Sequence, residues 1–587
     1  MKTISSLLKT IPCSILIIIT AALVFFPVTG FPLEPPRPGE IDRYKADGSL
    51  AGRMEFVHSL LNHRFHPSLI ERKTARMKAL QDGVDINNIA VQSFPYKTGL
   101  PSHGKPKIFV LLIEFPDYPH TQDKSVFENK LFGSGILTDV PYESLKSYYS
   151  RSSYGQLAIE GTVLDWYRAK HRRKFYGRES KTLWYSGPRN LIKEALSYHE
   201  SSHDFSPYDN NGDGVIDYFI VIWTGPDEGW GSNWWAWCDS RGRRFEKDSF
   251  TIGGKKLGVF SWQWEKNEKQ GEPEYTPQTT IHETGHALGL PDYYDYDEKQ
   301  GPNGGVGGLD MMDANQYDHN CFSKWMLDWL EPAFITSGRQ TLSLRPAADF
   351  TDCVAIMPGT APLNIFSEFF MVQYRNIGTG NDYVLPGYGF LIWHVDGRLD
   401  DKGADFKYDN SYTEHKLLRL MEADGLEQIE TGEGLADFED FYVPFTGKEF
   451  SSDTTPNSNN YAGVRTDVAV KNIAADAFTF ATMTAQFIVG DDLPPVSGPP
   501  VIDSFTANPG SGSSPLTVTF TCEARVAPGQ AALYIWDFNG DYVEDSDTYV
   551  QTTSYTYYYP GVYNVNVMVV DGNGQQSAIA TTTVTVY

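Results

Sequence analysis

The sequence predicts a multidomain protein in which a mixed α/β domain is followed by a β-rich domain and a small C-terminal β-sandwich. Its 587 residues exceed what one hydrophobic core supports, because single cores stop growing near roughly 250 to 300 residues. Apolar runs and helical patterns fill the first half, whereas short strands separated by Gly, Asn and Pro turns dominate after about Pro332. Three or four domains are therefore expected.

The N-terminus has the pattern of a secretory signal peptide over residues 1–30. Lys2 and Lys9 precede an apolar run from Ile11 to Phe26, and small residues follow it. The run is shorter than the roughly 20 apolar residues of a spanning helix, which disfavours the alternative of a membrane anchor. We expect a secreted, extracellular protein that has no membrane association once the signal is cleaved.

Residues 31–100 are predicted to form a propeptide containing a helix from Met54 to Leu80; a simple N-terminal extension is the alternative. The continuous apolar run from Ile108 to Ile113 is typical of a strand in the middle of a sheet, and it opens the main α/β domain at 101–334. Further elements of that domain are expected near Tyr142–Ser150, Asn190–Tyr198 and Tyr218–Trp223.

Strands such as Phe369 to Tyr374 place the β-rich domain at residues 335–490. The Pro-rich stretch at 491–500 is typical of a stiff, extended linker. Beyond it, residues 501–587 are rich in Thr, Val and Tyr, and their short alternating strands predict a β-sandwich.

Charge and cysteine content narrow the class of protein. The formal net charge of -25 argues against nucleic acid as a partner, because a phosphate backbone would be repelled. Cys13 leaves with the signal, and Cys238, Cys321, Cys353 and Cys522 show no paired metal-binding spacing. One or two disulfides and buried free thiols remain alternative interpretations.

The segment His-Glu-Thr-Gly-His from His282 to His286 has the spacing of a zinc site on a helix. Two histidines four residues apart lie on one face of a helix, so both can direct a nitrogen at one metal ion. Pro277 suits the first turn of this helix, and Gly289 with Pro291 is expected to end it.

Asp292 is the predicted third zinc ligand, because the turn at Gly289 returns the chain toward the same ion; Asp295 is the alternative. Zinc with three protein ligands keeps a position for water, whose pKa it lowers toward about 7. Glu283 follows the first histidine and is the expected catalytic residue, a general base that takes a proton from attacking water and passes it to the leaving amine. The motif therefore predicts metal-dependent hydrolysis of peptide bonds.

The extended pattern resembles that of the metzincin-like zinc peptidases, His-Glu-x-x-His-x-x-Gly-x-x-His or Asp. Asp292 stands where most of that clan has His. The resemblance implies a zincin fold for the α/β domain, with a methionine turn beneath the metal. Gly307 to Asp313 looks like that turn, and Met312 is its better match; a methionine pair in a core strand is the alternative.

Within this clan the chain resembles the immune inhibitor A family of secreted bacterial metallopeptidases. The likeness covers roughly Lys105 to Ala485 and is carried by Leu112–Asp117, Ser153–Leu157, Leu391–Asp396 and Met421–Gly425. The family implies proteolysis of extracellular proteins, so protein and peptide substrates are expected. With residues 31–100 as a propeptide, the protein would be a zymogen that cleaves internal peptide bonds. Two alternatives stay open: an extracellular binding or adhesion protein with a vestigial zinc site, and a metal-dependent amidase or esterase.

Residues 209–217 have the spacing of a calcium loop, with Gly214 at the sixth position for the sharp turn. Ile220 stands where such loops carry a bidentate Glu, so any Ca²⁺ would need a ligand from elsewhere. A plain turn rich in Asp and Asn is the alternative. The predicted calcium ligands are Asp209, Asn211, Asp213, Val215 and Asp217.

The C-terminal domain resembles the PKD family of immunoglobulin-like modules through Tyr534–Asp541 and Tyr557–Tyr563. Such modules imply a spacer, or a binder of extracellular polymers or cell-surface proteins. Trp536 is expected in the core rather than at a binding surface. A calcium-like spacing recurs from Asp537, although Tyr542 replaces the glycine.

Several aromatic residues near the metal motif have two interpretations. Trp230, Trp234, Trp235 and Trp237 either line a cleft for substrate or pack in the core, so no specificity pocket is assigned to them. Tyr317 or His319 would suit stabilisation of an oxyanion after the methionine turn, but a structural role is expected for both and for His394.

Overall fold

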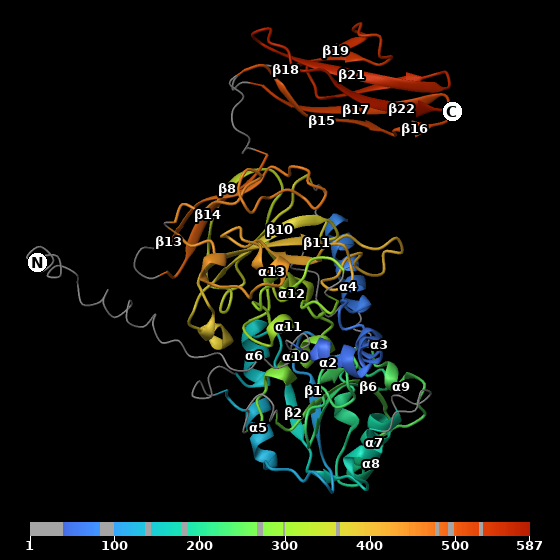
Figure 1. The fold of residues 1–587 in the computed structure, drawn as a ribbon, viewed down its shortest axis with the longest axis vertical. Coiled ribbons are helices and arrows are strands. Elements are labelled where there is room, and N and C mark those ends of the chain that lie inside the picture. The colour runs from blue at the N-terminus through green and yellow to red at the C-terminus, as the bar shows by residue number, and fades with distance from the viewer. Residues whose placement is uncertain are drawn as a thin grey trace, which may run out of the picture. The chain divides into compact units, whose positions relative to one another are not determined.

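The computed structural model describes eleven stretches of the chain, and its ribbon is drawn in Figure 1. They are residues 39–82, 99–135, 143–177, 186–266, 274–297, 300–359, 364–444, 446–475, 480–490, 498–526 and 532–587. The chain divides into two compact units, Met1–Asp491 and Asp492–Tyr587. The predicted signal peptide and most of the predicted linker lie outside the described residues.

Three helices form the described part of the N-terminal segment: α2 (Glu40–Asp47), α3 (Leu50–Leu60) and α4 (Pro67–Gln81). The prediction of one helix from Met54 to Leu80 is wrong. Leu61 adopts a left-handed conformation (φ 61°) that ends α3, and α4 restarts at a proline, which lacks the N–H needed to continue a helix but is tolerated in the first turn.

The first sheet of the larger unit has six strands in the order β2-β1-β4-β6-β5, with β3 also paired to β1. Only the edge strand β5 runs antiparallel to its neighbour; the other pairs are parallel. The strands are β1 (Lys107–Glu114), β2 (Glu160–Val163), β3 (Tyr167–Arg168), β4 (Val215–Trp223), β5 (Trp237–Cys238) and β6 (Lys256–Trp264). The predicted strand at Ile108–Ile113 is thus confirmed as β1.

Helices cover both faces of this sheet. Alternate residues of β1 divide between two cores: Val110 packs with Ile281 of α10 on one face, and Leu111 packs with Leu191 of α8 on the other. The helices are α5 (Lys124–Phe132), α6 (Leu145–Ser152), α7 (Arg173–Tyr176), α8 (Ser186–His199), α9 (Arg243–Glu246), α10 (Gln278–Ala287), α11 (Met311–Ala314) and α12 (Cys321–Met326).

The β-rich part contains a five-stranded sheet, β12-β11-β10-β9-β7, and a three-stranded sheet, β13-β14-β8. Met371 and Trp393 of the larger sheet belong to the same core as Ile281 and Met312, so this part shares its interior with the α10 face of the first sheet. The strands are β7 (Ala333–Ile335), β8 (Gly338–Leu344), β9 (Cys353–Ile356), β10 (Glu368–Arg375), β11 (Gly389–Asp396), β12 (Leu418–Leu420), β13 (Val468–Ala475) and β14 (Met483–Val489).

The C-terminal unit is built from two sheets, β15-β17-β20 and β16-β22-β21-β18-β19, around one core. Trp536 lies in that core with no exposed surface, as the sequence predicts, and its indole N–H donates to Thr548. The strands are β15 (Val501–Asn508), β16 (Ser511–Gly512), β17 (Leu516–Arg525), β18 (Ala532–Asp537), β19 (Ser546–Thr548), β20 (Thr552–Tyr557), β21 (Gly561–Asp571) and β22 (Ala580–Val586).

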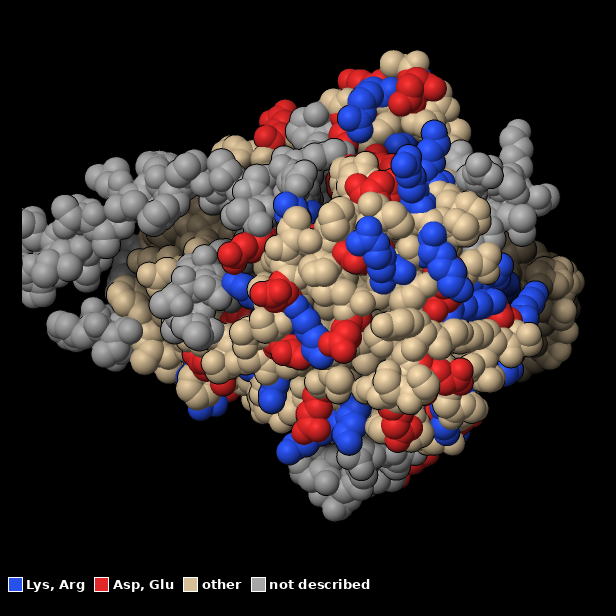
Figure 2. Space-filling model, turned by 90° about the horizontal axis from the view of Figure 1, so that it is seen from below, with Lys and Arg blue, Asp and Glu red and all other residues tan. Residues whose placement is uncertain are grey.

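The surface and the cysteines add three observations. On the face drawn in Figure 2, acidic and basic side chains are interspersed. Cys238, Cys321, Cys353 and Cys522 are buried free thiols, which decides between the two alternatives left open by the sequence. Within the described stretches, no helix combines the length and the apolar character needed to cross a membrane.

Candidate metal centre

Helix α10 carries the His-Glu-Thr-Gly-His segment through the interior, and every residue from Gln278 to Ala287 is buried. Tyr149 anchors its first turn by donating to the carbonyl of Ile281 (2.6 Å). Gly285 lies directly against Met312, and a methyl group at this position would overlap the Met312 sulfur. The helix ends where Gly289 adopts a left-handed conformation (φ 102°) and donates its N–H to His286.

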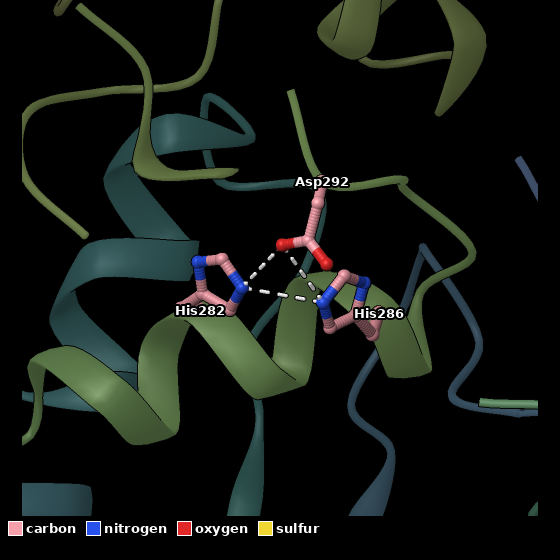
Figure 3. Close-up of side chains that lie close together, drawn as sticks. All are labelled: His282, His286 and Asp292. Atoms are coloured by element: carbon pink, nitrogen blue, oxygen red, sulfur yellow. Dashed lines mark hydrogen bonds and ion pairs between the residues drawn. The ribbon is translucent and has the colours of Figure 1, made fainter. Parts of the chain in front are cut away.

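Three side chains converge on one point above α10, as Figure 3 shows. The Nε2 atoms of His282 and His286 are 3.2 Å apart, and Asp292 Oδ1 lies 2.9 Å from the first and 3.2 Å from the second. A tetrahedral zinc ion with bonds of about 2.0 to 2.2 Å places its ligands about 3.3 Å apart. The three residues therefore fit zinc in both chemistry and spacing.

Each of the three side chains is oriented by a hydrogen bond on its far side. Nδ1 of His282 donates to the carbonyl of Met311 (2.9 Å), and Nδ1 of His286 donates to that of Leu290 (2.9 Å). The proton on Nδ1 leaves Nε2 of both rings as the ligand atom. The hydroxyl of Tyr296 donates to Asp292 Oδ2, which leaves Oδ1 directed at the two histidines.

Buried carboxylate oxygens without hydrogen-bond partners in the described stretches, together with shifted pKa values, indicate that this site suits a cation. Neither carboxylate oxygen of Glu283 has a hydrogen-bond partner among the described residues, although both are buried. Burial raises the pKa of Glu283 to about 8, with Asp292 adding to the effect and His286 opposing it. Burial also acts to raise the pKa of Asp292, but where no metal binds Nε2 the charge of protonated His286 and hydrogen bonds from both histidines hold that pKa well below its usual range.

Helix α11, capped by Asp310, lies against α10 and supports the site. Met311 and Met312 are fully buried, and Met312 accepts a hydrogen bond at its carbonyl from the backbone of Tyr293 (2.9 Å). Asp310 caps this turn through Met312 N (2.7 Å) and binds Asn320 with its other oxygen. Met311 and Met312 thus lie in a short helix beside α10 rather than in a core strand, and their role as a methionine turn stays a prediction.

The N-terminal segment closes over the ligand loop. The carbonyl of Asn62 accepts the N–H of Asp292 (2.7 Å), and the N–H of His66 donates to Gly289 (2.9 Å). The side chain of Asn62 is itself held by Cys238 and Ser240. All three predicted ligands are at most 2% exposed beneath this cover.

The predicted calcium loop is folded but already internally bonded. Asp209 accepts three backbone N–H groups and the ammonium of Lys255 (2.6 Å), while Asp217 accepts from Asn210 N (2.6 Å). Burial raises the pKa of Asp217 to about 7, with Asp213 and Asp209 contributing after it. Calcium at this loop stays a prediction.

The other candidates from the sequence lie away from the metal ligands or within the core. Asp295 is buried but does not join His282, His286 and Asp292 in their cluster. Trp230, Trp234, Trp235 and Trp237 are all buried in the core on the α8 face of the sheet, which favours packing over a cleft. His319 packs against Tyr148 and Tyr149. Tyr317 donates to Val384, and His394 pairs with Glu368.

Sequence reasoning missed several residues that shape the site. Asn62 and Tyr149 reach it from separate segments, and no local spacing signals such contacts. Tyr296 lies in the ligand loop itself, four residues after Asp292. Asp310 had a usable signal, because an Asp directly before a short apolar segment is a common helix cap.

Comparison with known proteins identifies two regions of the chain. The family model described as the immune inhibitor A peptidase M6 catalytic domain matches residues 97–320, and the model of the PKD domain matches residues 504–585. Immune inhibitor A of Bacillus thuringiensis subsp. alesti is 27% identical over 244 residues, 33% of this chain and 34% of that protein. Pre-pro-metalloprotease PrtV of Vibrio cholerae serotype O1 is 28% identical over 228 residues, 32% and 25% respectively.

The matched region thus spans only about a third or a quarter of these relatives. Among solved structures, the PKD domain of an M14-like peptidase from a Thermoplasmatales archaeon is similar at 22% identity, covering 15% of this chain and 95% of that one. The TM-score of this comparison is 0.13.

Proposed function

Because the chain carries an immune inhibitor A peptidase M6 domain and a C-terminal PKD domain, we propose that it is a secreted, zinc-dependent endopeptidase with a zincin-type catalytic domain. The observation that carries the proposal is the convergence of His282 Nε2, His286 Nε2 and Asp292 Oδ1 within 3.2 Å of one another, each oriented from behind. Internal bonds of extracellular proteins are the proposed substrates.

His282, His286 and Asp292 would hold the zinc. When bound, zinc supplies a Lewis acid that polarises a peptide carbonyl and lowers the pKa of water. Asp292 also offsets part of the ion's charge, and its own negative charge is held in place by Tyr296. The apolar surroundings contributed by Met312 and the rest of the core exclude bulk water and strengthen these interactions.

Glu283 would hold and move the proton. It follows His282 on α10, its two oxygens are free of hydrogen bonds among the described residues, and burial raises its pKa to about 8. A carboxyl group with a pKa near neutrality is suited to accept a proton from water and return it to a leaving amine.

The test compares Glu283→Gln with the wild-type protein in digestion of casein or gelatin. The substitution keeps the shape of the side chain but removes its basicity, so we expect a loss of at least about a hundredfold in kcat/KM with zinc content unchanged. Activity within a few-fold of the wild type would refute the role. Digestion of small esters but not of protein would favour the esterase alternative.

We further propose that residues 31–100 act as a propeptide. The support is the pair of backbone hydrogen bonds that join Asn62 and His66 to the ligand loop, together with the burial of the three ligands, which are at most 2% exposed. A substrate needs that surface, so removal of the segment would activate the enzyme.

The remaining parts of the proposal are calcium and the PKD domain. Ca²⁺ at residues 209–217 would have to compete with Lys255 for Asp209. If calcium raises the thermal stability of Asp213→Asn by as much as that of the wild-type protein, calcium binding at this loop is contradicted.

The PKD domain would bind an extracellular polymer or a cell-surface protein. Deleting residues 501–587 should abolish cosedimentation with that material while sparing casein digestion.

A further inference from the structure

A second group of carboxylates lies in the β-rich part of the larger unit, apart from the candidate zinc ligands. Glu422, Asp424 and Asp440 each bring one carboxylate oxygen to within 4.8 Å of the others. Glu422 and Asp424 follow strand β12, and Asp440 ends a short 3-10 helix (η7, Phe438–Asp440). Glu422 and Asp440 are each 3% exposed, so two of the three negative charges are buried.

The backbone accounts for only part of the bonding capacity of these carboxylates. Glu422 accepts the N–H groups of Gln428 and Ile429, and Asp424 accepts that of Leu426. Asp440 accepts one N–H, from Asp437, at Oδ2 (2.8 Å).

The other oxygen of Asp440, Oδ1, is buried and has no hydrogen-bond partner among the described residues. The hydroxyl of Tyr442 is also buried and unpartnered there, and its pKa is raised by burial and then by the charges of Asp424 and Asp440. Two polar side chains more than nine-tenths buried thus lie at this cluster with bonding capacity left over.

The charges at the cluster do not compensate one another. Burial raises the pKa of Asp440 to about 7, and the charges that act on it next are those of Glu422, Asp424 and Asp437, all negative. Burial likewise raises the pKa of Glu422. Buried like charges are costly unless a cation or a proton joins them.

We propose that Glu422, Asp424 and Asp440 bind a Ca²⁺ ion. Carboxylate oxygens are the ligands that hard cations prefer, and three of them from an irregular loop suit the irregular coordination of Ca²⁺ better than the strict octahedron of Mg²⁺. The free oxygen of Asp440 supplies a ligand that no protein donor uses. Backbone carbonyls and water would complete the coordination.

The site closes a loop that supports the catalytic region. Residues 422–440 pack against the start of the predicted methionine turn: Ala436 N donates to the carbonyl of Gly307 (2.9 Å), and the side chain of Ile429 lies against Gly307. A cation that ties Glu422 to Asp440 therefore fixes both ends of this loop. The inference does not depend on the proposed peptidase activity.

The experiment is calcium titration calorimetry on the full chain at constant zinc, in a Glu283→Ala background that prevents self-digestion. Asp440→Asn and Asp424→Asn each remove one charged ligand, and Glu433→Gln is the matched control because Glu433 is exposed and outside the cluster. We expect one calcium site to be lost, or weakened by at least about tenfold, in both Asn variants and to be retained in the control.

Other calcium sites in the chain do not obscure the result, because the variants are compared for the loss of one site. Asp424 is less buried than Asp440, so Asp424→Asn keeps the test valid if Asp440→Asn fails to fold. The same number of sites with unchanged affinities in Asp424→Asn and the control would overturn the proposal. So would the absence of any calcium binding by the parent protein.

Discussion

Acidification is expected to loosen the N-terminal segment from the ligand loop, and His63 is the main reason. This ring is 2% exposed, and burial lowers its pKa from 6.5 to about 3. Arg64, His58 and Arg241 act in the same direction as burial, and Asp292 opposes them. A cation at the metal site would lower the pKa further.

The sign follows from proton binding. When the segment is docked, His63 stays neutral down to about pH 3, whereas in the released segment it takes up a proton below about pH 6.5. The released state binds more protons between these values, so docking is stable at neutral pH and weakens as pH falls. Moving from pH 7 to pH 5 costs the docked state about 2 kcal/mol, at 1.36 kcal/mol for each unit below 6.5.

His66 adds to the effect. Its pKa is also lowered to about 3, first by burial and then by Arg241 and Arg243. This ring is only partly buried, so we count about 1 kcal/mol for it after allowing for solvent screening. The two rings together predict docking about a hundredfold weaker at pH 5 than at pH 7.

Hydrogen–deuterium exchange on the full chain carrying Glu283→Ala measures the change directly. The amides of His66 and Asp292 report the two hydrogen bonds that join the segment to the ligand loop. Their protection should fall at pH 5, after correction for intrinsic exchange rates, and His63→Gln should remove most of the fall. The matched control is His171→Gln, at an exposed histidine outside the segment. Equal protection at both pH values, or a pH response undiminished in His63→Gln, would refute the reasoning.

Two further substitutions probe the site and its support. Tyr296→Phe removes the hydroxyl that orients Asp292, so zinc affinity should fall about 10- to 100-fold in a chelator competition while the fold is kept; unchanged affinity would mean that Asp292 needs no such partner. Arg375→Ala leaves the fully buried Asp382 without its guanidinium, so the free energy of unfolding should fall by about 3 to 5 kcal/mol in denaturant titrations. A loss below about 1 kcal/mol would show that Asp382 finds another partner.

The spacing of residues in the sequence predicted the contacts of the site that form between residues close together in the chain. His282 and His286 converge because four residues make about one helical turn, and Asp292 reaches them because Gly289 takes the left-handed turn that its lack of a side chain permits. Strand β1 was also predictable, because a short continuous apolar run is typical of a strand that is buried on both faces of a sheet.

What escaped prediction depends on contacts between distant segments. The helical pattern of residues 54–80 gave the right type of structure, but the reversal at Leu61 that brings Asn62 to the ligand loop is set by tertiary contacts with Cys238 and Ser240. The same holds for the carboxylate cluster, where Asp440 returns to Glu422 through an irregular loop that has no periodic signal.

The hydrogen bonds at the metal centre divide into two sets, and the division bears on activation. The bonds that orient the ligands, from His282 to Met311, from His286 to Leu290 and from Tyr296 to Asp292, all lie within residues 282–311. The bonds at Asn62 and His66 are different, because they join the ligand loop to the N-terminal segment. At the ligand loop, releasing that segment exchanges two backbone hydrogen bonds for bonds to water, at a net cost of about 1 kcal/mol each, and leaves every orienting bond in place. The site can therefore be uncovered while the bonds that orient its ligands stay intact, as the proposed activation by loss of residues 31–100 requires.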